Sequence, residues 1–550
     1  MTEVVVDGRT LSYGDVVAVA HHGAHVALAD GVLPRLVRER AVVDDVVDRQ
    51  VPTYGLTTGL GARSSYALPR AELDAFSVRT VRGRANAVGD PLPVPVVRAA
   101  LVSRVNGLVG GGSGVRPEIV RLLVEMLNAR VHPVIPEVGS IGASDLCQMA
   151  HVGLVVIGEG GAEYDGEVLD GATALRRAGL APAQLGPKDG HVLCSASPLA
   201  AGIGALALHE TAALLTLAQA VTALTYEGFR ANTSPLDARV LALRPAPGQS
   251  RAAAELLSLL TGGELTDPRN ARRVQDPVSL RCAAQMHGAG YAALAFADAA
   301  LMPELNGCGD NPVVLGGAGG VVEGLSGAGD NPGTPPGAGD TPDSLTDTGG
   351  EPHAPAPRAN AEILSSGNFH TPALALAYDT LALALTQTAA VSAERMRRLL
   401  DPAVTGLPAN LSPYGPERSG FAPLVKTAQA LVAEVRMLSV PVCTDPRQGA
   451  DAVEDDSTNA ALGARRLTTM LGRLRQLLAV EAVVASQAVD LAAPAALGRG
   501  PGYLHRAIRK VVPTLTDDRP HGVDVETVSR DILGSEDVRG TLNSWAKEAT

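Results

Sequence analysis

Large aromatic side chains are scarce in this sequence. Phe, Trp and Tyr make up 3% of its 550 residues, whereas 46% are hydrophobic, with Ala, Val and Leu dominating. Small aliphatic side chains let helices approach closely, and a chain of this length can bury a large core. The composition therefore favours a mainly helical protein.

An excess of positive charge is missing as well. The chain carries 46 Lys and Arg residues against 58 Asp and Glu residues, a formal net charge of −12. A nucleic-acid partner requires a basic face on the protein. We therefore expect no nucleic-acid partner.

The sequence also lacks the cysteine spacings that are typical of metal or redox sites. The five cysteines form no CxxC pair and show no zinc-like spacing with histidine. An odd number without such pairs is typical of reduced thiols in a reducing compartment, so we expect no metal site. The five are Cys147, Cys194, Cys282, Cys308 and Cys443.

The sequence shows no secretory or membrane pattern. The stretch MTEVVVDGRTLSYGD lacks a basic segment followed by an apolar one, which a secretory signal requires. The most apolar stretches, 199–223 and 372–391, are interrupted by His209, Glu210 and Asp379. We interpret them as buried helices and expect a cytoplasmic protein without a membrane partner.

Two regions of different character divide the chain. Residues 50–150 contain short elements broken by glycine, whereas long helix-compatible stretches follow at 198–227, 283–303, 360–400, 423–438 and 460–491. We predict an all-α fold built on a long-helix bundle, with an N-terminal domain (1–195) and a helical domain (196–550). Residues 316–357 are rich in Gly, Pro and Asp, which predicts a disordered surface insertion; a functional lid is the alternative.

Seven motifs in order along the chain carry a family resemblance. They are YGLTTGLG (54–61), MLNARVHPVIPEVGSIGASDL (126–146), LGPKDG (185–190), RPAPGQ (244–249), VQDPVSLRC (274–282), ELNGCGDNP (304–312) and SGNFH (366–370), with a shorter VED at 453–455. Together they resemble the aromatic amino acid ammonia-lyases, and the histidine enzymes more than the phenylalanine enzymes. The resemblance implies a small-molecule substrate and an all-helical homotetramer whose active sites each draw residues from three subunits.

The chemistry of such a lyase sets three requirements. A base must remove a weakly acidic Cβ proton, a cation must hold the carboxylate, and the amine must become a good leaving group. The family meets the third with methylidene-imidazolone (MIO), an electrophile formed from its own Ala-Ser-Gly tripeptide. No external cofactor is then needed.

Three residues match the family's substrate-handling groups. Tyr54 matches the general base, and because tyrosine ordinarily titrates near 10, such a base needs cationic neighbours, for which Arg84 and Arg281 are candidates. Arg281 matches the arginine that grips the substrate carboxylate in two-point contact. Asn311 matches an amide that orients the substrate. Without the motifs, a packed loop tyrosine, a structural ion pair and a turn asparagine would be the plain alternatives.

Three further residues match the lining of the family's pocket. They are Gln275, Phe369 and Glu454. Histidine-specific members use a carboxylate at the position of Glu454 to hold the imidazole ring. On charge pattern alone, Glu454 would be a solvated residue at a helix start.

The electrophile motif departs from the family pattern. The chain has Ala143-Ser144-Asp145 followed by Leu146, so the third-position glycine is missing. Ring closure bends the backbone severely, which glycine tolerates and a residue with a Cβ tolerates poorly. A standard MIO from Ala143 and Ser144 is therefore not expected.

Three other positions around the electrophile also differ. Val278 replaces the second catalytic tyrosine, Ser195 replaces an asparagine, and Arg84 replaces a pocket histidine. The base, the carboxylate clamp and the pocket acid remain, so the sequence predicts an altered site.

The sequence leaves several functions open. The first is elimination of ammonia from histidine or a similar aromatic amino acid to give an acrylate. The second is MIO-independent elimination of trimethylamine from a histidine betaine, which resembles the reaction of ergothionase; Arg84 would then contact the ring. An aminomutase and a non-catalytic scaffold or regulatory subunit are the remaining alternatives.

Overall fold

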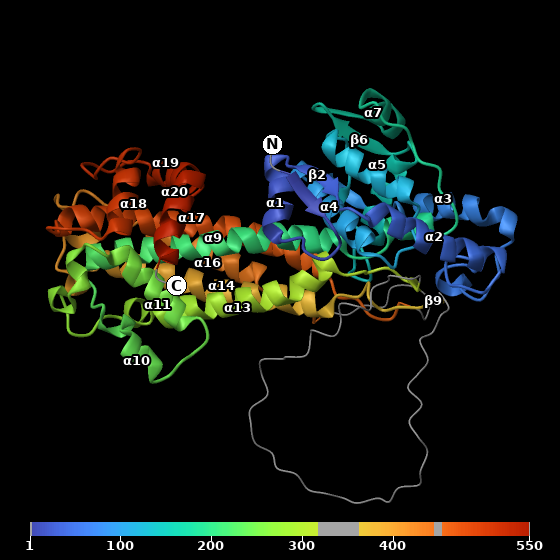
Figure 1. Ribbon diagram of the computed structural model, residues 1–550. Coiled ribbons are helices and arrows are strands. Elements are labelled where there is room, and N and C mark those ends of the chain that lie inside the picture. The colour runs from blue at the N-terminus through green and yellow to red at the C-terminus, as the bar shows by residue number, and fades with distance from the viewer. Residues whose placement is uncertain (1–2, 317–361, 445–453, 549–550) are drawn as a thin grey trace, which may run out of the picture.

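Five long helices form the body of the protein. The computed structural model describes residues 3–316, 362–444 and 454–548, so the expected insertion at 316–357 lies outside the described residues except for Gly316. The five helices pack side by side as a bundle (Figure 1). They are α9 (Pro198–Phe229), α13 (Ala283–Asn306), α14 (Pro372–Leu399), α16 (Leu424–Leu438) and α17 (Ala460–Ala492).

Apolar periodicity explains why these segments are helical. In α17, Leu467, Met470, Leu471 and Leu474 recur at helical spacing, and each is at most 2% exposed. One stripe of such residues faces the neighbouring helices, which removes apolar surface from water. The observed bounds lie close to the predicted ranges except that α14 begins at Pro372. The all-α fold class is confirmed.

The N-terminal region consists of shorter elements beside one end of the bundle (Figure 1). Helix α4 packs against α9 and joins this region to the bundle. The helices are α1 (Tyr13–His22), α2 (Val32–Asp48), α3 (Leu73–Arg84), α4 (Val94–Gly110), α5 (Pro117–Asn128), α6 (Leu146–Val156), α7 (Gly171–Arg177) and α8 (Asp189–Cys194). The domain boundary near residue 195 stays a prediction, although short elements do give way to long helices at α9.

Small sheets pair segments within and beside this region. Strands β1 (Glu3–Val6) and β2 (His25–Leu28) are parallel, whereas β3 (Val88–Pro91) and β5 (Pro136–Val138) are antiparallel. Strands β4 (His132–Pro133), β6 (Gly161–Tyr164) and β7 (Glu167–Asp170) form a three-stranded sheet, and β8 (Val313–Leu315) pairs with β9 (Glu362–Leu364).

Short helices complete the C-terminal half. Helices α18 and α20 contact α9, and α19 contacts α17, at the end of the bundle away from the N-terminal region (Figure 1). The bounds are α10 (Ala238–Ala242), α11 (Gln249–Leu260), α12 (Val278–Arg281), α15 (Pro402–Thr405), α18 (Arg499–Arg509), α19 (His521–Thr527) and α20 (Glu536–Lys547).

A buried ion pair ties three bundle helices together. Arg395 of α14 donates from Nε to Oε1 of Glu481 in α17 at 2.7 Å, and both side chains are fully buried. Thr225 of α9 and Ser392 of α14 donate to the same carboxylate at 2.8 and 2.6 Å. These extra donors compensate for the water that the carboxylate loses on burial.

Two helical segments are long and apolar enough, by length and composition alone, to cross a membrane. They are 189–229 and 372–399, and the most apolar windows are 94% and 56% buried inside the protein. From the sequence we expect the polar residues of these segments to exclude a membrane span. By length and composition alone, they do not exclude it. Burial in the bundle accounts for the apolar character of the first segment.

Candidate active site

A cavity of 360 Å³ lies where six separate segments of the chain meet. Its size suits a small molecule such as an amino acid. Seven of the predicted site residues line it, namely Tyr54, Ala143, Ser144, Ser195, Asn311, Phe369 and Glu454. The remaining lining residues, which the sequence did not single out, are Ser64, Leu146, His191, Ser365, Ser366 and Gly367.

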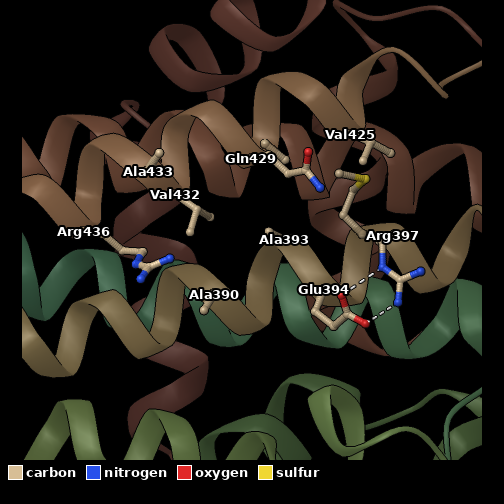
Figure 2. Close-up of a pocket in the computed structure, with 11 residues that line it drawn as sticks. Ala390, Ala393, Glu394, Arg397, Val425, Gln429, Val432, Ala433 and Arg436 are labelled. Carbon is tan, nitrogen blue, oxygen red and sulfur yellow. Dashed lines mark hydrogen bonds and ion pairs between the residues drawn. The ribbon is translucent and has the colours of Figure 1, made fainter.

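A second hollow, of 320 Å³, lies between α14 and α16 and has a different character (Figure 2). Ala390, Ala393 and Val432 line it with aliphatic groups. Its carboxylate, Glu394, is paired with the Arg397 guanidinium at 2.6 Å (Figure 2). The cavity around Tyr54 is therefore the better candidate for an active site.

Tyr54 stands on a tight glycine loop. Gly55 has φ +64°, and a Cβ there would lie 2.6 Å from Leu60 Cδ2, so only glycine fits without movement. The backbone N–H of Gly61 donates to the Tyr54 hydroxyl oxygen at 3.2 Å. The loop thus fixes the phenol at the cavity and supplies a donor that would stabilise negative charge on its oxygen.

The Ala143-Ser144 segment is a compact turn held by the segment that follows Glu454. A Cβ on Gly142 would lie 2.0 Å from Thr458 Oγ1, and Gly142 has φ +83°. Thr458 donates to the Gly142 carbonyl at 3.1 Å. Ser144 itself has φ +64°, a left-handed conformation that side chains disfavour. The turn that carries Ala143 and the segment that carries Glu454 therefore form one wall of the cavity.

Asp145 is fully buried and caps α9. Its carboxylate accepts hydrogen bonds from Leu199 N at 2.9 Å, Ala200 N at 3.0 Å and Ser140 Oγ at 2.6 Å. Its own backbone N–H donates to the Ala196 carbonyl at 2.9 Å. Burial raises the pKa of this carboxyl, and the three hydrogen bonds oppose that shift. Hydrogen bonds thus hold both the side chain and the backbone nitrogen of Asp145.

Asn311 and Phe369 lie on loops that are fastened to each other. The Asn311 side-chain oxygen accepts from Ser366 N at 2.8 Å. The Phe369 carbonyl accepts from Ser197 Oγ at 3.1 Å. These bonds position the amide and the aromatic ring on a shared rim of the cavity.

A buried salt bridge anchors the Asn311 loop from behind. Asp310 is 1% exposed and pairs with both terminal nitrogens of Arg104, at 2.8 and 3.2 Å. Burial raises the pKa of Asp310, but the charge and hydrogen bonds of Arg104 outweigh it and leave the pKa below its usual value. A two-point contact of this kind fixes the direction of the loop.

His191 lines the cavity next to Tyr54. The two rings meet edge to face, with centroids 6.1 Å apart and planes at 86°. Burial lowers the pKa of His191 to about 4, and the positive charges of Lys188 and Arg84 add to this effect. The imidazole is therefore neutral at neutral pH. The sequence motifs did not identify it, because it lies on the short helix α8 just after the LGPKDG motif.

Arg84 is the last residue of α3 and is not among the residues that line the cavity. Burial raises the pKa values of the Cys147 and Cys194 thiols, and the charge of Arg84 opposes that rise. The charge of Glu454 also acts on the Cys147 thiol and adds to the rise in its pKa. Within the described ranges, the Arg84 side chain has no ion pair. It is therefore a cation available to a ligand.

Arg281 and Gln275 lie apart from the cavity within one chain. They precede α13, whereas Asn311 follows it, and a 24-residue helix spans about 36 Å. Gln275 is exposed, and the neighbouring Val278 is 58% exposed. Arg281 pairs with no carboxylate in the part of the chain that the structure describes. A shared site of Tyr54 and Arg281 thus stays a prediction that requires more than one chain.

The side chains of the described ranges provide no metal centre. No group of three or more His, Cys, Asp or Glu residues among them is arranged to hold a metal ion. The cavity itself presents phenol, carboxylate, imidazole, hydroxyl and amide groups.

Comparisons with known proteins identify the family of this chain. Residues 11–510 match the family model described as aromatic amino acid lyase. A histidine ammonia-lyase of Treponema denticola is 37% identical over 518 residues, covering 94% of each chain. The structure of ergothionase from Treponema denticola, in complex with desmethyl-ergothioneine sulfonic acid, has 28% identity, a TM-score of 0.84 and coverage of 100% and 99%.

A tyrosine aminomutase of Streptomyces globisporus has the same architecture, with 29% identity, a TM-score of 0.84 and coverage of 100% and 99%. The family model covers most of the chain, and the histidine ammonia-lyase matches along nearly its whole length. This chain therefore belongs to the aromatic amino acid lyase family.

Proposed function

We propose that this protein is a carbon–nitrogen lyase that eliminates a tertiary amine from a histidine-derived betaine and works without MIO. The proposal rests on the hydrogen bonds that hold the side chain and the backbone nitrogen of Asp145. Ring closure would require the Asp145 nitrogen to leave the Ala196 carbonyl and attack the Ala143 carbonyl. That rotation would also strain three hydrogen bonds of a fully buried carboxylate. The residues present do not fit the electrophile.

The nature of the leaving group follows from this. A base that can remove a Cβ proton would first take the more acidic N–H proton of a primary ammonium, leaving an amine that cannot depart. A quaternary ammonium has no N–H proton to lose. It keeps its positive charge until the C–N bond breaks and departs as a neutral tertiary amine. Such a substrate removes the need for an electrophile.

Tyr54 is the proposed base. Its phenolate oxygen takes the Cβ proton, the C–H electron pair becomes the second bond between Cβ and Cα, and the C–N electron pair leaves with the amine. The product is an acrylate. The Gly61 N–H at 3.2 Å supports the charged form of the oxygen.

The other groups of the cavity would hold the substrate. Glu454 would accept a hydrogen bond from the ring and Phe369 would pack against it. Arg84, which lies outside the lining residues, would add positive charge on the side of the ring edge or of a sulfur substituent. Ser195 and Asn311 lie where the amine and carboxylate end would be placed. This assignment agrees with the ergothionase resemblance in fold.

Arg281 and Gln275 would come from a second copy of the chain within a homotetramer. The length of α13 keeps them from the Tyr54 cavity of their own chain. Their surroundings, including the 93% exposed Val274, present an open surface to a partner subunit. An arginine without a carboxylate partner in the described ranges is suited to bind the substrate carboxylate.

A second candidate is elimination of ammonia from histidine itself. The observation that favours it is the 37% identity to a histidine ammonia-lyase over nearly the full length. An aminomutase reaction depends on the electrophile more heavily and is disfavoured by Asp145. A non-catalytic role is disfavoured because Tyr54 and Glu454 both line a cavity that suits a small molecule.

Direct assays distinguish these functions. Purified protein is incubated with ergothioneine, histidine betaine, histidine and phenylalanine, and the acrylate is followed by ultraviolet absorbance while the released amine is identified. We expect trimethylamine from a betaine and no ammonia from histidine. Ammonia release from histidine would replace the first proposal with the second. Acrylate formation by the Tyr54→Phe variant at the wild-type rate would refute both.

A further inference from the structure

One nitrogen of the His191 ring has a partner and the other has none. Nε2 lies 2.6 Å from the backbone carbonyl oxygen of Asn311. A carbonyl oxygen only accepts, so Nε2 carries the hydrogen. Nδ1 is buried and has no hydrogen-bond partner in the described part of the chain.

The unpartnered nitrogen is an acceptor. With the hydrogen on Nε2, a neutral imidazole presents a lone pair at Nδ1. Native proteins seldom bury an acceptor without a donor, because the group has lost its water and gained nothing in return. A donor supplied by a ligand would correct this deficit.

The place of the ring in the cavity limits which ligand group can supply that donor. His191 stands under the Tyr54 loop, where a Cβ on Gly55 would lie 3.7 Å from His191 Cγ. It lines the same cavity as Glu454. A histidine betaine has no N–H at its amine end, so its only N–H donors are on the ring.

We propose that His191 is a specificity-determining residue whose Nδ1 accepts a ring N–H of the substrate. This inference rests on the proposed function and names the ring that the site selects. Glu454 and His191 supply two acceptors, which match a five-membered ring with N–H on both nitrogens. The thione form of a 2-thioimidazole has that pattern. A neutral imidazole has one N–H and one lone pair, and a phenyl ring has neither.

Binding of the acrylate products tests the inference without turnover. Calorimetry at neutral pH compares thioimidazole acrylate, imidazole acrylate and phenyl acrylate. Wild-type protein should bind the first at least about tenfold more tightly than the second, since one hydrogen bond separates them. His191→Gln keeps an amide N–H for the Asn311 carbonyl, and its acceptor oxygen does not occupy the position of Nδ1. It should lose most of that preference while binding phenyl acrylate as the wild type does.

Two outcomes would overturn the inference. One is an unchanged preference in His191→Gln; the other is an equal loss for all three ligands, which indicates a purely structural role. If His191→Gln does not fold, wild-type protein is titrated with thioimidazole acrylates methylated on one or the other ring nitrogen. Each methyl group should weaken binding about tenfold, and no effect at either nitrogen contradicts the proposal.

The same data keep the two proposals separate. Product binding does not depend on which amine leaves. A protein that selects the thioimidazole ring but releases no amine from any betaine would refute the proposed function and leave the role of His191 standing.

Discussion

Co-expression of two inactive variants tests whether the active site is shared between chains. Tyr54→Phe removes the base hydroxyl and keeps the ring, and Arg281→Gln removes the guanidinium charge. Loss of a general base lowers turnover by roughly 10²- to 10⁴-fold. Arg281 precedes α13, whereas Asn311 of the Tyr54 cavity follows it, and the helix is about 36 Å long. We therefore expect that no histidine-sized substrate reaches both Tyr54 and Arg281 of the same subunit.

The expected recovery follows from random assembly. In a mixed oligomer, half of the sites draw position 54 from an intact chain, and half draw position 281 from an intact chain. If the two positions come from different subunits, roughly a quarter of the sites are wild type at both. Co-expressed variants should therefore recover about a quarter of wild-type activity, whereas each variant alone stays inactive.

A second mixture provides the control. The double variant, co-expressed in equal amount with wild-type chain, should retain roughly a quarter of the activity if the site is shared between subunits and about half if it lies in one chain. Acrylate formation is measured on purified oligomers whose composition is confirmed by mass spectrometry. Absence of recovery in assembled Tyr54→Phe/Arg281→Gln mixtures, together with half activity in the control, would refute the shared site.

Three further predictions concern the electrophile motif, pH and the buried charges. Insertion of glycine between Ser144 and Asp145 should allow ring closure and lower the intact mass by two waters, whereas the wild-type mass is unchanged. Burial lowers the pKa of His191 from 6.5 to about 4, so the neutral ring contributes fully to stability above pH 6.5. As the pH drops towards 4, the free energy of unfolding should fall by about 3 kcal/mol. In chemical unfolding, His191→Gln should lose less stability than the wild type over the same pH range. Glu481→Gln leaves Arg395 buried without its charge partner and should lower the free energy of unfolding by about 3–5 kcal/mol.

Each of these three predictions has a matched control. Insertion of alanine in place of glycine should produce no mass loss, and an unchanged mass after glycine insertion would contradict the account of the motif. His25→Gln, at a half-exposed histidine, should leave the pH dependence as it is. Asp45→Asn, in an exposed ion pair with Arg49, should change stability far less than Glu481→Gln.

The sequence predicted the long helices because their bounds depend on local signals. Apolar residues at helical spacing mark α17, and proline at the first turn marks the beginning of α9 and α14. The small sheets were not predicted. Strand β8 pairs with β9 across the segment that the structure does not describe, and such distant pairings leave no local pattern.

Motif matching predicted most of the cavity, since those residues lie on loops whose glycines and turns have a recognisable order. It could not place Arg281, because the length of α13 decides which chain's cavity that residue reaches. It also missed His191, which belongs to a short apolar helix and matches no motif. Its importance depends on one unpartnered nitrogen, which no sequence pattern reveals.

The altered motif and the unpaired imidazole have a common explanation. An enzyme with an electrophile identifies its substrate partly by covalent reaction with the amine. Without that reaction, selection depends on the groups that hold the rest of the molecule. A site built to hydrogen-bond a polar substrate rejects an analogue without the donor far more strongly than an apolar pocket rejects a missing methylene. Arg84, His191 and Glu454 would place such groups around the ring, so we expect selectivity to have moved from the amine to the ring.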